Sequence, residues 1–181
     1  MKIRAFVAID IPESLKKEIK KIQEKLLEFK GKITETENLH LTLKFLGWIS
    51  EETIGEIKKR LRKIRFNQFN TKIDSIGIFD NTKHGDYTRQ IVVWLHLTNT
   101  EQLQKEIDLV LSPLFEKERR FMSHLTIARG KDAGNKKEFF SHLKKIKIKP
   151  LDFAIKNFRL KKSVLKREGP RYETIEEYPL I

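Results

Sequence analysis

The tripeptide His-Leu-Thr occurs three times in this 181-residue sequence, and two of the copies have matching surroundings, NLHLTLKFLG and MSHLTIARG. Residues two apart on a β-strand point to the same face. Each motif therefore presents an imidazole and a hydroxyl together, His40 with Thr42 and His124 with Thr126. Imidazole can move protons near neutral pH, and a hydroxyl can hydrogen-bond an anionic oxygen. Two such pairs facing each other would form an acid/base site for a phosphate ester.

The third copy contains His96 and differs from the other two, because polar Asn99 and a helix-cap signal follow it directly. One alternative is a zinc site made by His40, His96 and His124 with an open fourth position. Against it, the sequence has no close-spaced ligand pair and no acidic residue tied to the motifs. We therefore interpret His96 as a structural residue at a strand end, and we predict neither a metal ion nor any other cofactor.

Two cations near the motifs could bind a phosphate. Arg129 could hold a phosphate oxygen with charge-assisted, often bidentate hydrogen bonds. Strict alternation would place Arg129 on the face opposite His124, so this role requires a twist or bulge at the strand end. Lys44 is in phase with His40 and Thr42 and is the rival candidate.

Aromatic and basic residues suggest how a nucleic acid could be held. Phe45 or Tyr172 could stack on a base, with core packing as the alternative. The segments 144–149 and 159–167 alternate basic with apolar residues. This alternation fits half-buried strands whose basic face follows a phosphate backbone, although a solvated surface explains it equally well.

The composition indicates a folded protein with a polyanionic partner. Apolar residues make up 39% and charged residues 35% of the chain, and the net charge is +13. This charge favours RNA or DNA as partner, with a lysine-rich and glutamate-rich thermophile surface as the alternative. The absence of Cys suits a cytoplasmic protein. No segment reads as a signal peptide or a membrane span.

Apolar spacing and cap signals predict alternating strands and helices. Helices are expected to begin at Pro12, Ser50, Thr100 and Asn135, and the first should end at Gly31. Strands are expected over 3–9, 33–46, 69–79, 90–98, the second motif, 151–163 and 171–177, and a loop over 80–88.

The two halves of this pattern repeat, and the motif histidines His40 and His124 lie 84 residues apart. We therefore predict an α/β (α+β) fold with two pseudo-symmetric lobes. Each lobe would have an antiparallel-rich sheet with helices outside, and both motifs would face a central cleft. No linker is rich in Pro, Gly or Ser, so residues 1–181 are expected to form a single bilobal phosphoesterase domain.

The paired motifs resemble those of the two-histidine phosphoesterases, in particular the bacterial and archaeal RNA 2′,3′-cyclic phosphodiesterases, also called 2′-5′ RNA ligases. The likeness extends over nearly the whole chain, from RAFVAI at Arg4 through both motifs to FRL, SVL and GPRY between Phe158 and Tyr172. The resemblance implies a metal-independent site in which His40 is the proton donor and His124 the proton acceptor. His96 is not part of the family pattern.

The function expected from residues and resemblance together is hydrolysis of RNA-terminal 2′,3′-cyclic phosphate to a 2′-phosphate, with reversible 2′-5′ ligation by the same site. Thr42 and Thr126 would bind the oxygens on which negative charge builds. The partner would be RNA with cyclic phosphate ends, such as tRNA fragments, and we expect a monomer that does not bind membranes. The alternatives are a two-histidine exonuclease that trims RNA 3′ ends and a non-catalytic RNA-binding module.

Overall fold

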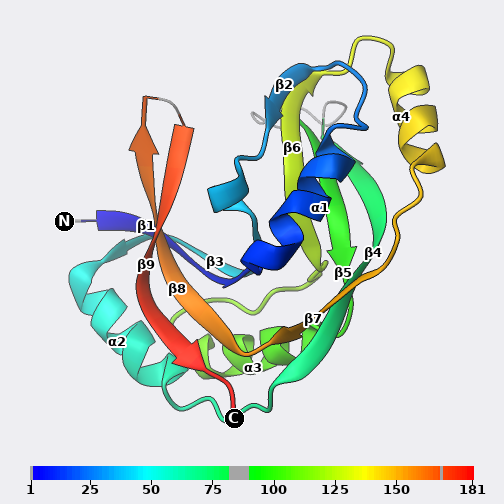
Figure 1. Ribbon diagram of the computed structural model, residues 1–181. Coiled ribbons are helices and arrows are strands. Elements are labelled where there is room, and N and C mark those ends of the chain that lie inside the picture. Colours follow the sequence, from blue (N-terminus) through cyan, green and yellow to red (C-terminus); the bar gives the residue numbers. More distant parts are fainter. Residues whose placement is uncertain (1, 82–89, 168) are drawn as a thin grey trace.

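The computed structural model describes residues 2–81, 90–167 and 169–181, whose strands form one curled antiparallel sheet (Figure 1). The strands are β1 (Lys2–Asp10), β2 (Lys30–Ile33), β3 (His40–Ser50), β4 (Phe69–Asp80), β5 (Ile91–Leu97), β6 (His124–Asp132), β7 (Leu151–Ile155), β8 (Asn157–Lys166) and β9 (Gly169–Pro179). Their order across the sheet is β7-β4-β5-β6-β3-β1-β8-β9, and β2 pairs with β6. The expected loop over 80–88 lies largely outside the described residues.

In the described residues, four α-helices and one 3₁₀-helix connect these strands: α1 (Glu13–Gln23), η1 (Thr36–Asn38), α2 (Glu51–Leu61), α3 (Glu101–Leu111) and α4 (Lys136–Lys145). Ser50 caps α2 by accepting a hydrogen bond from the backbone nitrogen of Thr53, as the sequence predicts. Asn135 caps α4 in the same way. Thr100 occupies the N-cap position of α3, but its hydroxyl donates to the Ser123 hydroxyl at 2.7 Å instead of capping the helix.

The expected end of the first helix is wrong. Helix α1 ends at Gln23, and Gly31 lies in β2. A Cβ atom at Gly31 would lie 2.3 Å from the Arg129 carbonyl oxygen, so glycine is required here by the close approach of β2 to β6. The C-terminal region also differs, because it forms three strands, β7, β8 and β9, where two were expected.

The helices cover one face of the sheet. Helices α2 and α3 pack against β3, α1 packs against β6, and α4 packs against β4. Leu41 and Leu43 of β3, like Leu125 and Ile127 of β6, are at most 1% exposed in the core beneath these helices. We call the opposite face, which carries His40 and His124, the motif face.

Each motif strand has a β-bulge at the same place. In β3 the pairing with β1 passes from Thr42 to Lys44, and in β6 the pairing with β5 passes from Thr126 to Ala128. The extra residue reverses the alternation. Consequently the residue five positions after each histidine, Phe45 in β3 and Arg129 in β6, returns to the motif face.

The sheet brings the two halves together through the motif strands. Strands β3 and β6 run antiparallel, with Leu41 opposite Leu125. The α+β class and the antiparallel sheets with outer helices are therefore confirmed. The strands of both halves belong to one continuous sheet, however, because β3 and β6 are hydrogen-bonded neighbours.

Candidate active site

The pairing of Leu41 with Leu125 places the two motifs side by side. Because the strands are antiparallel, the residue before one leucine faces the residue after the other. His40 therefore neighbours Thr126, and Thr42 neighbours His124. All four side chains point away from the core, since the leucines between them are fully buried.

Both histidines are held in the same tautomer by matching hydrogen bonds. The Nδ1 atom of His40 lies 2.7 Å from the carbonyl oxygen of Asn38, and the Nδ1 atom of His124 lies 2.8 Å from the carbonyl oxygen of Met122. A carbonyl oxygen can only accept, so each Nδ1 donates. In the neutral ring, Nε2 then has a free lone pair, which can take or return a proton.

His40 packs in an aromatic cluster that also fixes its protonation state. Its ring centroid lies 5.0 Å from that of Phe6 and 4.8 Å from that of Tyr172. Burial lowers the pKa of His40 to about 4, and the charges of Lys161 and Arg129 add to the lowering, although the Asn38 carbonyl opposes it. His40 is therefore neutral at pH 7 in the absence of a bound anion.

His124 has an equivalent aromatic neighbour in the other half of the sheet. Its ring lies 5.2 Å from the ring of Phe79 on β4 in an edge-to-face arrangement. Burial lowers the pKa of His124, the hydrogen bond to Met122 raises it, and the charge of Arg129 lowers it. A neutral His124 can act as a proton acceptor at pH 7.

Arg129 lies on the motif face, where its proposed role requires it to be. Its guanidinium donates to the Thr126 hydroxyl at 3.3 Å. Its charge contributes to lowering the pKa of both His40 and His124. The bulge in β6 that the sequence interpretation required is present.

The prediction from strand alternation that Lys44 lies beside His40 and Thr42 is wrong. The β3 bulge turns the side chain to the helix-covered face, where the residue is 5% exposed. Its Nζ atom lies 2.5 Å from the Asp108 carboxylate and also donates to the Glu116 carbonyl oxygen. Burial alone would raise the pKa of Asp108, but the hydrogen bonds from Lys44, the Glu118 backbone and Gln104, together with the charge of Lys44, lower it. Lys44 is thus the partner of a buried carboxylate and not a cation of the motif face.

Phe45 and Tyr172, the two aromatic candidates, both lie on the motif face. Phe45 is 61% exposed and stands 6.4 Å from the buried Phe6 ring. Tyr172 on β9 contacts His40 edge-on. Phe45 is available to a ligand, whereas Tyr172 also supports the histidine.

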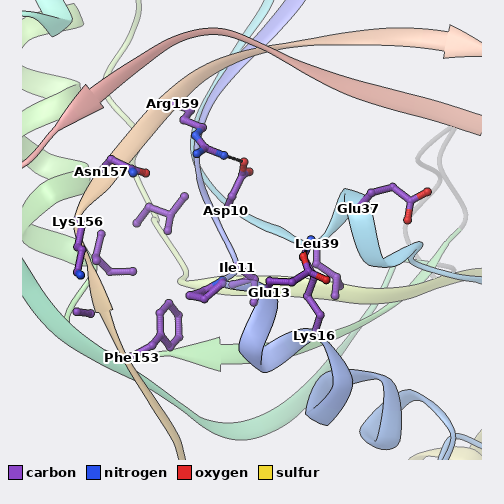
Figure 2. A pocket seen from close by; sticks show the side chains of 14 residues that line it. Asp10, Ile11, Glu13, Lys16, Glu37, Leu39, Phe153, Lys156, Asn157 and Arg159 are labelled. Atoms are coloured by element: carbon purple, nitrogen blue, oxygen red, sulfur yellow. Dashed lines mark hydrogen bonds and ion pairs between the residues drawn. The ribbon is translucent and has the colours of Figure 1, made fainter.

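Sequence reasoning missed an ionic cluster beside His40. Asp10 is opposite His40 in the β1–β3 register, and its carboxylate binds Lys161 at 2.6 Å and also Arg159. Burial alone would raise the pKa of Asp10, but these two cations lower it. A cavity of about 640 Å³ next to this cluster is lined by Asp10, Arg159 and Glu37 but by neither motif histidine (Figure 2).

The third His-Leu-Thr copy contributes a histidine next to the motifs. His96 pairs with His124 across β5 and β6, and its Nδ1 atom lies 2.9 Å from the Asp74 carboxylate. Within residues 2–81, 90–167 and 169–181, no three His, Cys, Asp or Glu side chains are grouped as metal ligands. The three-histidine alternative therefore has no geometric support in this part of the chain.

One of the two basic segments, 159–167, forms the half-buried strand that the sequence suggested, and the other does not. Residues 144–149 form the end of α4 and an extended connection to β7. Segment 159–167 lies mostly in β8, and three of its cations have carboxylate partners: Arg159 and Lys161 bind Asp10, and Lys162 binds Glu173 at 3.0 Å. The structure describes no helix that is both long and apolar enough to span a membrane.

Comparison with protein families agrees with this arrangement. The model of the LigT-like phosphoesterases matches residues 9–86 and 97–172. The RNA 2′,3′-cyclic phosphodiesterase of Methanocaldococcus jannaschii is 41% identical over 97% of this chain and 100% of that protein. The enzyme of the same name from Thermotoga maritima is 33% identical over 97% of this chain and 94% of that protein.

Solved structures show the same fold. Escherichia coli LigT complexed with 3′-AMP has a TM-score of 0.79 and 24% identity, with 99% of each chain covered. TT0787 of Thermus thermophilus has a TM-score of 0.78 and 24% identity, with 98% of each chain covered. The fold of this chain therefore also occurs in crystal structures.

Proposed function

We propose that this chain, which belongs to the LigT-like phosphoesterase family, hydrolyses the 2′,3′-cyclic phosphate at the end of an RNA strand. The observation that carries the proposal is the antiparallel meeting of the two motifs, with both Nδ1 atoms bound to carbonyl oxygens. The names of the relatives at 30% identity and above support the reaction class.

In the proposed reaction, His124 Nε2 accepts a proton from water as the water oxygen bonds to phosphorus. The bond from phosphorus to the ribose 3′ oxygen breaks, and His40 Nε2 donates a proton to that oxygen. The product is a 2′-phosphate. Thr42, Thr126 and Arg129 bind the non-bridging oxygens, where negative charge increases in the transition state. If an RNA 5′-hydroxyl takes the place of water, the same steps form a 2′-5′ linkage without a nucleotide cofactor.

The low pKa of His40 fits this scheme only if the substrate changes it. With a pKa of about 4, His40 carries a proton in roughly one molecule per thousand at pH 7. A cyclic phosphate is an anion, and an anion beside His40 favours the charged form of the ring. Substrate binding therefore prepares the proton donor, while His124 remains available as the acceptor.

The test is turnover of a nucleoside 2′,3′-cyclic phosphate, with the product identified by ³¹P NMR. His40→Ala and His124→Ala should each reduce kcat by about a hundredfold to ten-thousandfold, the usual effect of one general acid or base. The reduction in kcat in the double variant should be far smaller than the product of the two single reductions. His142→Ala is the matched control, since this imidazole also bonds a carbonyl oxygen, that of Lys25, but lies on α4.

Several outcomes would contradict the proposal. Near-normal turnover in either folded single variant would exclude the two-histidine mechanism. Tight binding of the cyclic phosphate with no turnover would indicate an RNA-binding module. Turnover confined to the 3′-terminal linkages of longer RNA would indicate an exonuclease.

A further inference from the structure

Two exposed aromatic rings continue the motif face along β3, beyond the histidine. Phe45 is 61% exposed and Trp48 is 63% exposed. A single exposed apolar side chain is common on a protein surface, but exposed aromatic side chains that form a contiguous patch often mark a binding site.

The register of β1 and β3 places both rings on the same face. Phe45 is opposite Phe6, and Trp48 is opposite Arg4. Phe6 and Arg4 are two residues apart and share a face, and directly opposed residues share it too. Phe45 and Trp48 are three residues apart and would point to opposite faces in a regular strand.

A second bulge in β3 produces this arrangement. The register shifts between Ala5 and Phe6, so that Leu46 is the extra residue, and Gly47 has a φ of 70°. Glycine adopts this left-handed conformation without steric cost. A Cβ at Gly47 would have no atom within 4 Å, so the conformation and not the available space is what requires glycine.

The rings form a surface that is continuous with the site of His40. Centroid distances of 4.8 Å from His40 to Tyr172, 5.1 Å from Tyr172 to Phe6 and 6.4 Å from Phe6 to Phe45 connect the histidine to the first exposed ring. Trp48 is the next ring, in the row of Arg4, about 7 Å further along the strand. The charge of Arg4 contributes to lowering the pKa of Arg129, after the larger effect of burial.

We propose that Phe45, Trp48 and Arg4, which we call the β3 platform, bind the unpaired nucleotides that precede the terminal cyclic phosphate. This inference rests on the proposed function, because it uses the phosphate at His40 as the fixed end of the strand. Phe45 and Trp48 each stack on a separate base, and Arg4 binds the phosphate between them. Stacking tolerates any base, so the platform selects single-stranded RNA ends without selecting sequence.

The composition of the β3 platform favours single-stranded RNA over a protein as its ligand. Arg4 lies in the row of Trp48, next to the row of Phe45, and the whole chain carries a net charge of +13. Aromatic rings alternating with arginine are typical of single-strand binding sites, whereas the centre of a protein interface is depleted of charge.

The experiment compares kcat/KM for a nucleoside 2′,3′-cyclic phosphate and for a tetranucleotide ending in the same group. Trp48→Ala should lower the value for the tetranucleotide about tenfold, mainly through KM, and leave the mononucleotide within twofold. Trp48→Phe should restore most of the loss. Leu109→Ala is the control, because Leu109 is 56% exposed but lies on α3. A tetranucleotide lacking the bases before the terminal nucleotide should be insensitive to Trp48→Ala.

Failure of the platform and failure of the proposed function give different results. Equal losses on both substrates, or no loss with Trp48→Ala, would overturn the platform while leaving the hydrolysis intact. If no cyclic phosphate is hydrolysed, binding of a uridine tetranucleotide to wild type, Trp48→Ala and Trp48→Phe decides the question. Binding that depends on the aromatic ring supports the platform even then. Concentration-dependent self-association that Trp48→Ala abolishes would instead identify a second copy of the chain as the occupant.

Discussion

Acidification should destabilise the folded protein through His40, and the pKa of about 4 sets the magnitude. In the unfolded chain a histidine titrates near 6.5. Between these two pKa values the folded protein binds fewer protons than the unfolded chain does. The free energy of unfolding therefore falls as the pH falls from about 6.5 to about 4. The gap between the two pKa values corresponds to about 3 kcal/mol in total, of which about 2 kcal/mol is lost by pH 5. Above the unfolded pKa the contribution is fully retained.

Urea denaturation of wild type and His40→Gln at pH 8 and pH 5 measures this contribution. Other groups titrate in both proteins, so the comparison concerns only the difference between the two losses. The loss on acidification should be about 2 kcal/mol smaller in His40→Gln, whatever the substitution costs at pH 8. Thr42→Val is the control, because it alters the neighbouring side chain without removing a titrating group, and its loss should equal that of wild type.

Identical losses in wild type and His40→Gln would refute the reasoning, as would an NMR titration that finds the imidazole of His40 protonating near pH 6.5. A further titration with inorganic phosphate bound tests the link to catalysis. The anion should raise the pKa of His40. An unchanged pKa would mean that substrate binding does not prepare His40 as the proton donor.

The remaining predictions concern the buried ion pair, the phosphate contacts and the metal. Lys44→Met should lower the free energy of unfolding, measured by urea denaturation, by about 3–5 kcal/mol, because it leaves the Asp108 carboxylate buried without its cation. The double variant Lys44→Met, Asp108→Leu should recover much of this loss. Arg129→Ala should impair turnover of mononucleotide and oligonucleotide alike, whereas Lys147→Glu should weaken only the oligonucleotide and reduce the salt dependence of its KM. Turnover should persist in excess EDTA, and a loss that zinc restores would contradict the metal-independent scheme.

Much of the fold was predictable because its signals are local. Alternation around the motifs predicts strands, and the side chains of Ser50 and Asn135 predict two helix starts that the structure confirms. The lysines of segment 144–149 were misread because alternating basic and apolar residues fit an extended connection as well as a strand. The end of α1 was misplaced because Gly31 is required by the approach of β2 to β6, a contact between distant segments.

The site was predictable only as far as the bulges. His40, Thr42, His124 and Thr126 precede the bulges and lie on the face that alternation predicts. Lys44 follows the bulge and lies on the opposite face from the one that alternation predicts. The bulge could not be predicted, because an extra residue in a strand leaves no signal in the composition of that strand. The neighbours of His40 across the sheet, such as Asp10, depend on strand order, and no spacing in the sequence indicates that β1 lies next to β3.

The equivalent positions held by Phe45 and Arg129 have a consequence for substrate orientation. A site with perfect twofold symmetry would accept an RNA end in two opposite directions, and each histidine would serve as donor in half of the encounters. The histidines, their carbonyl partners and the threonines repeat in both halves. At the position after the bulge, however, one half offers an exposed ring and the other a guanidinium. An RNA end is itself asymmetric, with a base on one side of the ribose and a phosphate on the other. In the proposed reaction only one direction would match base to ring and phosphate to guanidinium. Residues that take no part in proton transfer would then decide which of the two nearly interchangeable histidines is the donor.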